Sequence, residues 1–268
     1  MEANNRKRID MNKKSLGFIG GGRVTRIILE GFQRKGTEFK EVLVSDANPD
    51  VLVSLKSKFQ NIKTSSDNRQ PASCDVLFIA LHPPAVLPAL DEIKSALKHE
   101  PVLISLAPKI TISKISEKLD GFLRIVRMIP NACSIVNHGY NPVHFSPSLD
   151  EPEKKELLRI LAILGDCPEV DEDKLEVYAV LAAMGPTCLW FQLYELEKIG
   201  ITFGLTSQEV RRAVSCMAEG SAKTMNESHL NPVEVMDLIP VKPLKDDEED
   251  IRSRLRMRLE PLYEKIKP

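Results

Sequence analysis

The sequence predicts an α/β domain with a parallel β-sheet, followed by an all-α domain. Strand-like runs alternate with helix-like segments over residues 15–145, which is the pattern of a parallel sheet with helices on its faces. These runs are apolar almost throughout, as strands that are buried on both faces should be. After about residue 150, strand-like runs almost vanish and helical periodicity takes over.

Five strand-like runs organise the first half of the chain. They are SLGFIG (15–20), the stretch from Val42 to Ser45, CDVLFIAL (74–81), PVLISLA (101–107) and LRIVRMIP (123–130). Helix-like segments lie between them. In the first, Val24, Ile27 and Ile28 share one face, and Gly36 ends the segment. Further helical segments are predicted over residues 51–59, 84–97 and 112–119.

The second half is predicted to be helical throughout. Its helices are expected over residues 151–165, 173–200, 207–226 and 246–266, with a break or kink at Gly185-Pro186. The second of these is apolar nearly all round, and such a helix belongs in a core or an interface. We therefore expect a homodimer formed through the C-terminal helices. The predicted organisation is a disordered lead-in over residues 1–14, a domain over residues 15–150 and a helical domain over residues 151–268.

Composition excludes several classes of partner. The net charge is -1, which gives no electrostatic footprint for nucleic acid or for an anionic membrane. The apolar run Leu16 to Ile19 is far too short for a signal peptide or a membrane span. Five cysteines without a CxxC pair favour reduced thiols in a cytoplasmic protein. The chain has no HExxH pattern, and we expect no metal site.

A glycine loop follows the first strand and opens the first helix. Gly20, Gly21, Gly22, Arg23 and Val24 fit the start of the G-x-G-x-x-[G/A] pattern, with Thr25 in its last place. The first glycine permits a tight turn, and Gly22 lets the backbone approach a pyrophosphate at the helix N-terminus. The pattern therefore predicts a Rossmann-type domain that binds NADH or NADPH. The alternative is a βαβ unit that only needs a tight turn.

Asp46 stands where the second strand ends. A carboxylate there accepts hydrogen bonds from the ribose hydroxyls of NAD and repels the 2′-phosphate of NADP. The position therefore favours NADH. Two alternatives stay open: Arg23 could reach a phosphate, and Asp46 could simply be a turn residue before Asn48-Pro49.

The order of motifs resembles the pyrroline-5-carboxylate reductases. The resemblance covers about residues 15–240 and rests on segments that match family motifs in order. These segments are GFIGGGRV, DVLFIALHPP, LISLAPKITISKI, VRMIPNACSIVNHG, AAMGPTCLWF with GITFGLTSQEV, and EGSAKTM. The resemblance implies a Rossmann domain, a helical domain that builds a dimer, and hydride transfer from a reduced nicotinamide to a cyclic imine. Such an imine is already electrophilic, so orientation matters more than acid–base groups.

The resemblance also implies roles for particular residues. The glycine loop should line the pyrophosphate, and Ser45 with Asp46 should lie at the adenosine ribose. The residues expected around the nicotinamide half are Leu81, His82, Pro83, Ala107 and Asn131. The residues expected near the substrate are Pro130, Asn131, Thr187 and Lys242. No catalytic side chain is implied.

The chain departs from the family pattern mainly in its substrate half. His82 replaces a lysine, and Ala182-Ala183-Met184 with Thr187 replaces a serine- and glycine-rich helix start. The family's small-residue substrate loop is replaced by Ile239-Pro240-Val241-Lys242-Pro243-Leu244. Two potential N–H donors are lost with the prolines, and Lys242 offers one cation in return.

Three interpretations follow from these departures. The chain reduces pyrroline-5-carboxylate with Lys242 gripping the carboxylate, reduces a related imine or carbonyl, or binds the coenzyme without catalysis. A coenzyme F420-type enzyme and a hydroxyacid dehydrogenase are weaker alternatives. The latter usually carries a catalytic lysine on the first helix of its second domain. In the corresponding region, Leu175 to Ile199, the only lysine of this chain is Lys198, near the helix end.

Overall fold

The computed structural model describes residues 13–268, so the predicted lead-in lies outside the described residues except for its last two positions. The described chain forms two compact units. The first contains the residues up to Ala183 together with Tyr263–Pro268, and the second contains Met184–Leu262. The first unit therefore continues well past residue 150. The reason is helix α5 (Glu151–Leu161), whose apolar face is buried in the core beside the sheet.

A seven-stranded sheet forms the centre of the first unit. Its strand order is β3-β2-β1-β4-β5-β6-β8, and every pair is parallel except β6 with β8. The strands are β1 (Ser15–Ile19), β2 (Glu41–Ser45), β3 (Lys63–Ser65), β4 (Val76–Ile79), β5 (Val102–Ser105), β6 (Ile125–Met128) and β8 (Val143–Phe145). A small parallel pair joins β7 (Gly139–Tyr140) to β9 (Gly165–Asp166). The predicted parallel sheet is confirmed, with one antiparallel edge strand added.

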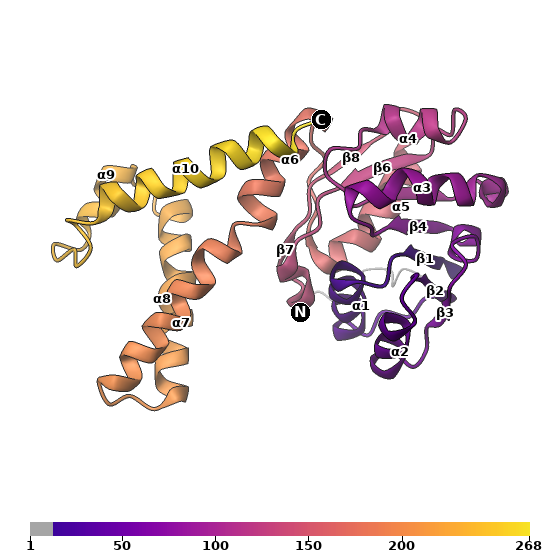
Figure 1. Ribbon diagram of the computed structural model, residues 1–268. Helices are drawn as coiled ribbons and strands as arrows, with labels where there is room; N and C mark the ends of the chain where they lie inside the picture. The colour runs from indigo at the N-terminus through magenta and orange to yellow at the C-terminus, as the bar shows by residue number, and fades with distance from the viewer. Residues whose placement is uncertain (1–12) are drawn as a thin grey trace, which may run out of the picture. The chain divides into compact units, whose positions relative to one another are not determined.

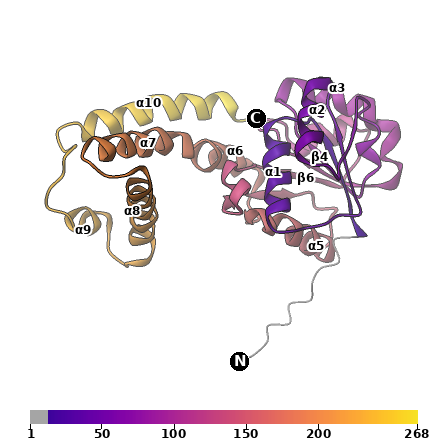
Figure 2. The ribbon, with the colours of Figure 1, turned by 90° about the horizontal axis from the view of Figure 1, so that it is seen from below.

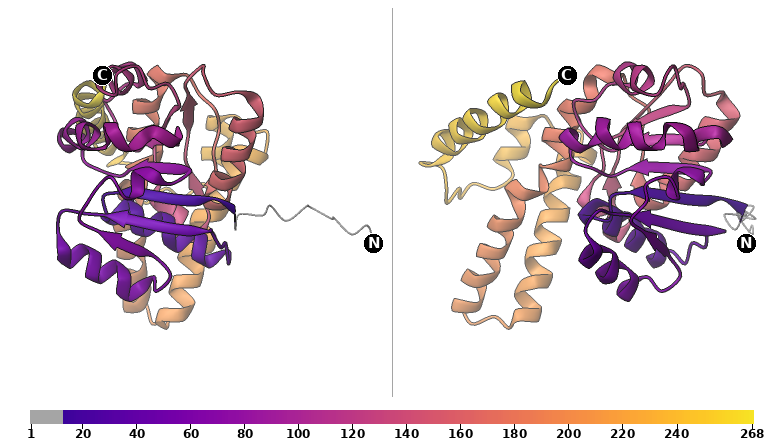
Figure 3. Two further views of the ribbon diagram at one scale, coloured as in Figure 1. Left: turned by 90° about the vertical axis from the view of Figure 1, so that its right-hand side faces the viewer. Right: turned by 45° about the vertical axis from the view of Figure 1, so that its right-hand side comes forward.

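Helices cover both faces of this sheet (Figures 1 and 3). One core contains the apolar side chains of α1 (Arg23–Arg34), α2 (Pro49–Lys58) and α5, and the other contains those of α3 (Pro83–Ile93) and α4 (Ile112–Lys118). Alternate strand residues point into the two cores, so the central strands are mostly apolar, with Ser105 of β5 and Arg127 of β6 as exceptions. The rings of Phe18 and Phe78 stack across the β1–β4 pair with centroids 4.7 Å apart.

The second unit is helical, as predicted. It contains α7 (Pro186–Thr202), α8 (Ser207–Glu227), α9 (Pro232–Asp237) and most of α10 (Glu248–Ile266). Helices α7 and α8 form a packed pair, and α10 is one long helix (Figures 1 and 2). The predicted break before Pro186 is also present. The first unit ends with α6 (Leu175–Tyr178) and a π-helical turn (Ala179–Ala183), and α7 begins after Gly185.

Candidate functional site

The carboxyl ends of five parallel strands bring the predicted coenzyme residues to one edge of the sheet. The glycine loop follows β1, Asp46 follows β2, Leu81 and His82 follow β4, Ala107 follows β5, and Pro130 with Asn131 follows β6. In open α/β sheets, ligands bind outside this edge. Strands β2 and β3 lie on one side of β1, and β4 lies on the other side. The strand order therefore reverses between β1 and β4, which is where the ligand crevice of such a sheet lies.

The glycine loop has the geometry of a tight turn. Gly20 has φ +99°, and its N–H donates to the Ser45 carbonyl at 2.8 Å. The Thr25 hydroxyl is buried and donates to the Gly20 carbonyl at 2.5 Å, so threonine in the third-glycine position closes the loop. Gly22 caps α1 and is exposed, with nothing within 4 Å of the place where a Cβ would stand. The loop thus leaves open space in front of the helix N-terminus.

Asp46 is tied directly to the glycine loop. One of its carboxylate oxygens accepts the Gly21 N–H at 2.8 Å, and the other accepts the Asn48 N–H at 2.8 Å. Asp46 is half-buried, whereas the neighbouring Ser45 is fully buried. The Ser45 hydroxyl donates to the Asn68 side chain at 2.7 Å. Of the two residues predicted at the ribose, Asp46 therefore has the more accessible polar group.

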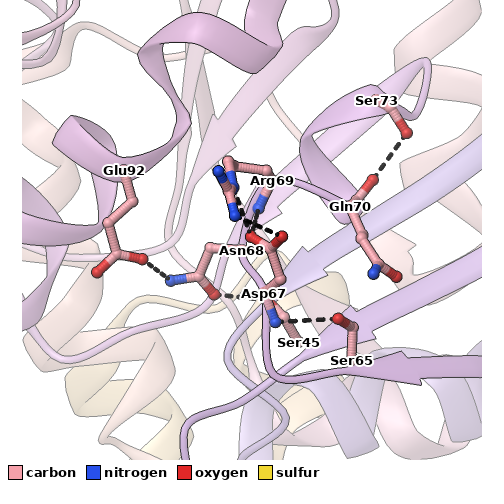
Figure 4. A network of polar contacts seen from close by, with 8 residues as sticks. All are labelled: Ser45, Ser65, Asp67, Asn68, Arg69, Gln70, Ser73 and Glu92. Carbon is pink, nitrogen blue, oxygen red and sulfur yellow. Dashed lines mark hydrogen bonds and ion pairs between the residues drawn. The ribbon is translucent and has the colours of Figure 1, made fainter.

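The loop over residues 65–70 adds polar groups that the sequence did not single out (Figure 4). Asn68 donates to Glu92 of α3 at 2.7 Å, and Arg69 grips the Asp67 carboxylate through Nε and Nη2 at 2.9 and 3.0 Å. This ion pair lowers the pKa of Asp67 and raises that of Arg69. Together with Ser66, these residues line an open pocket of about 400 Å³.

The residues predicted at the nicotinamide half lie at the ends of β4, β5 and β6. His82 is the exposed N-cap of α3 and makes no side-chain cap bond, whereas Ala107 is buried. Leu81 lies beside the glycine loop, because its Cδ2 would be 3.0 Å from a Cβ on Gly20. Pro83 is half-buried at the first position of α3.

Asn131 is held by hydrogen bonds of its own. Its N–H donates to Asn141 at 2.9 Å, its side-chain oxygen accepts the Cys133 N–H at 2.8 Å, and its amide donates to the Ala182 carbonyl at 2.8 Å. Ala182 lies in the π-helical turn, and such turns recur at functional sites. Asn131 is 5% exposed, and one of these three hydrogen bonds, the one to Ala182, fixes the turn after β6 to the segment that leads into α7.

A buried ion pair lies beneath this edge of the sheet. Arg127 of β6 is 1% exposed and contacts Glu176, which is 0% exposed, at 2.5 Å; it also reaches Glu172 at 3.2 Å. Glu176 accepts the Lys109 N–H at 2.8 Å as well. Lys109 has φ +76° and follows β5, so Glu176 connects the loop after β5 to β6. Arg127 stands within the apolar run IVRMI, and a charge in such a run is a sequence signal for a buried partner.

The remaining predicted substrate residues belong to the second unit. Thr187 is exposed near the start of α7, and its hydroxyl donates to the Met184 carbonyl at 2.6 Å. Lys242 is exposed in the loop between α9 and α10, where Leu244 is 59% exposed. No hydrogen bond joins Thr187 to Lys242 in the part of the chain that the structure describes.

Two titratable side chains near β6, those of Cys133 and Tyr140, have pKa values above their usual range. Burial raises the pKa of the Cys133 thiol, which disfavours the thiolate. Burial, with a contribution from Tyr178, raises the pKa of Tyr140, whose ring centroid lies 5.7 Å from that of Tyr178. Among residues 13–268, no three His, Cys, Asp or Glu side chains are arranged to hold a metal ion.

The fold and the glycine loop define the class of this chain as a Rossmann-type dinucleotide-binding protein with a helical second unit. A family model described as NADP oxidoreductase coenzyme F420-dependent matches residues 15–109, from β1 to the loop after β5. The longer matches are to pyrroline-5-carboxylate reductases. The enzyme from Corynebacterium melassecola is 24% identical over 82% of this chain and 83% of its own length. Pyrroline-5-carboxylate reductase 2 from Bos taurus is 28% identical over 83% of this chain and 71% of its own.

Solved structures give the same result. A pyrroline-5-carboxylate reductase from Coxiella burnetii aligns with a TM-score of 0.69 and 26% identity, covering 95% of this chain and 94% of its own. Pyrroline carboxylate reductase from Plasmodium falciparum, solved with NADP bound, has a TM-score of 0.81 at 21% identity and covers 96% and 98%. The resemblance predicted from the motifs is therefore confirmed, and it includes the helical second unit.

Proposed function

We propose that this chain is an NAD(P)H-dependent reductase that transfers a hydride to the imine carbon of pyrroline-5-carboxylate and forms proline. The observation that carries the proposal is the open glycine loop on a chain whose similarity to pyrroline-5-carboxylate reductases extends over 82% or more of its length. A match limited to the Rossmann part would support coenzyme binding alone.

The glycine loop fits a dinucleotide. The space in front of Gly22 is open, and the first turn of α1 supplies N–H groups without intrahelical partners. The positive end of the helix dipole favours the pyrophosphate at this place. When bound, the reduced nicotinamide supplies the hydride. The chain itself holds and orients the reactants, which is the main source of rate when the acceptor is already electrophilic.

Orientation of the reactants depends on the loops after β5 and β6. Ala107 is a small, buried residue after β5. Asn131 holds the turn after β6 against the π-helical turn, and Glu176 holds the loop after β5. We propose that these contacts fix the two loops, after β5 and after β6, against which the nicotinamide binds. Thr187 and Lys242 of the second unit remain the residues that we propose for binding the substrate.

Turnover with pyrroline-5-carboxylate tests the proposal directly. Purified protein should oxidise NADH or NADPH with this imine at neutral pH, at about 1–1000 turnovers per second. The measurement is the decrease in nicotinamide absorbance, with proline quantified as the product. Coenzyme binding without turnover would reject the proposed reaction. It would favour another imine or a carbonyl substrate, or a coenzyme-binding protein without catalysis.

Replacing Lys242 by alanine should raise the KM for pyrroline-5-carboxylate roughly 10- to 100-fold, because a charge-assisted bond to the carboxylate is lost. The kcat should change much less. Lys245, three residues further along the chain, is the matched control, and Lys245→Ala should keep the wild-type KM. An unchanged KM in Lys242→Ala would mean that the carboxylate is held elsewhere.

We propose further that the second unit is completed by a second copy of the chain. Its helices bury a single apolar side chain, Val210, among the described residues. Large apolar side chains of α7 remain exposed, among them Leu189, Trp190, Phe191 and Tyr194. A unit with so small a core needs a partner surface.

By length and composition alone, the stretch Glu172–Thr202 could also cross a membrane. The π-helical turn and the break at Gly185 interrupt that stretch, and we assign its exposed side chains to a dimer in the cytoplasm.

Replacing Phe191 by aspartate should shift the dimer toward monomer, with a dissociation constant raised by roughly 30-fold or more, because a charge would be buried in an apolar interface. Sedimentation velocity at several protein concentrations measures the shift. Lys114→Asp, an exposed charge change on α4 of the first unit, is the control and should sediment as wild type. Two variants with identical dissociation constants would place the interface elsewhere.

A further inference from the structure

We propose that the corner of the site formed by the ends of β2 and β3 selects NADH over NADPH. This inference rests on the proposed function, because it concerns the adenosine end of the same coenzyme. The two coenzymes differ at the 2′ position of the adenosine ribose, which carries a hydroxyl in NADH and a phosphate in NADPH. The selection depends on two carboxylates, those of Asp46 and Asp67, and on the way in which each is held.

Asp46 is fixed in place by the backbone. Its two carboxylate oxygens accept the N–H groups of Gly21 and Asn48, both at 2.8 Å. One of these donors belongs to the glycine loop, so the carboxylate cannot turn away from the coenzyme without breaking a bond to that loop. Each carboxylate oxygen retains acceptor capacity for a ribose hydroxyl. A 2′-phosphate at the same place would meet a fixed negative charge.

The cation of the neighbouring loop, Arg69, is already paired with a carboxylate. Arg69 forms a two-bond fork with Asp67, at 2.9 and 3.0 Å, and its N–H also donates to the same carboxylate at 3.0 Å. Such forks orient both side chains, although this pair is exposed and the contact itself is weak. To grip a 2′-phosphate with the same face of the guanidinium, Arg69 would have to leave Asp67 and expose that charge to the phosphate. Arg69 therefore does not offer a free phosphate clamp.

The rest of the pocket strengthens this bias. Asn68 is held between the Ser45 hydroxyl and the Glu92 carboxylate, both at 2.7 Å, which fixes the loop beside Asp46 (Figure 4). Asp67, Arg69 and Glu92 line the open pocket of about 400 Å³, so it holds two carboxylates and one guanidinium. Asp46 adds a third carboxylate to this corner, whereas Arg23, exposed at the first position of α1, is a further cation beside the glycine loop.

Binding without substrate tests the inference separately from the reaction. Calorimetric titration of the wild-type protein, with NADH and NADPH in 0.15 M salt, should give NADH at least about tenfold tighter binding. Asp67→Asn should reduce the ratio of the NADPH to the NADH dissociation constant severalfold, because NADPH should bind more tightly. The substitution removes one negative charge and releases Arg69. An asparagine can still accept the Arg69 N–H, so the loop is retained. The double variant Asp67→Asn/Arg69→Gln should lose the gain in NADPH affinity, since the released guanidinium is then absent.

Asp120→Asn is the charge-matched control. Asp120 lies in the turn between α4 and β6 and pairs with Lys94. Its replacement should leave the ratio of the two dissociation constants at the wild-type value. Equal wild-type affinities, a preference for NADPH, or a loss of NADPH affinity in Arg69→Gln alone would overturn the inference while the proposed function stands. Failure of both coenzymes to bind would overturn the proposed function and this inference with it.

Discussion

Replacing Gly22 by alanine is expected to weaken NADH binding roughly 100-fold while the free protein keeps its stability. Gly22 has φ −71°, which any residue adopts, and an added Cβ would meet nothing within 4 Å. The methyl group therefore costs little in the free protein. With a coenzyme bound, it would occupy the space through which the pyrophosphate approaches the backbone. Calorimetric titration measures the binding, and thermal unfolding measures the stability.

Two other glycines make this prediction specific. A Cβ on Gly220 of α8 also meets nothing within 4 Å, so Gly220→Ala should bind NADH as wild type does. Gly20→Ala should behave differently from both. Gly20 has φ +99° and its Cβ would lie 2.5 Å from the Ala80 carbonyl, so the free protein itself should be destabilised. Wild-type affinity in Gly22→Ala would mean that no pyrophosphate lies against this loop.

The Rossmann part of the fold could be predicted from sequence because its central strands are buried on both faces. Runs such as LGFI and VLFI are apolar at every position or broken only by glycine, so they stand out from the helices between them. The edge strands carry no such signal. β3 is Lys63–Ser65, a polar run of three residues, and β8 is the short antiparallel strand Val143–Phe145. Their pairing is set by tertiary contacts, which a local pattern does not contain.

The site was predictable to the extent that it depends on the chain order of strand ends. Strand ends of a parallel sheet meet at one edge, so the glycine loop, Asp46 and Asn131 could be placed there from sequence. What each polar group bonds to could not. Asn131 proves to be engaged with Ala182, and Arg69 with Asp67, through bonds whose partners are set by loop conformation. The resemblance supplied the roles of Leu81 and Ala107, which are apolar and carry no chemical signal of their own.

Replacing Arg127 by methionine should lower the free energy of unfolding by about 3–5 kcal/mol, because the buried Glu176 carboxylate loses its partner. Glu176 is 0% exposed and would retain only the Lys109 N–H. The matched control is Arg124→Met, just before β6. Arg124 pairs with Glu153 at side-chain exposures of 27% and 31%, where an ion pair contributes about 1 kcal/mol or less. Urea unfolding followed by circular dichroism gives both values, and equal losses would contradict the argument.

The double variant Arg127→Met/Glu176→Leu removes both charges of this contact and keeps side chains of similar volume. Apolar side chains of similar volume can replace a buried ion pair at little cost, so most of the lost stability should return. We expect kcat to stay depressed, whereas the affinity for NADH should be close to that of the wild type. Glu176 also holds the Lys109 N–H, and with that bond gone the loop after β5 is free to leave φ +76°. A stable double variant with depressed kcat and near-wild-type NADH affinity would identify Glu176 as a positioning residue for the nicotinamide site. Full recovery of kcat would show that the pair serves stability alone.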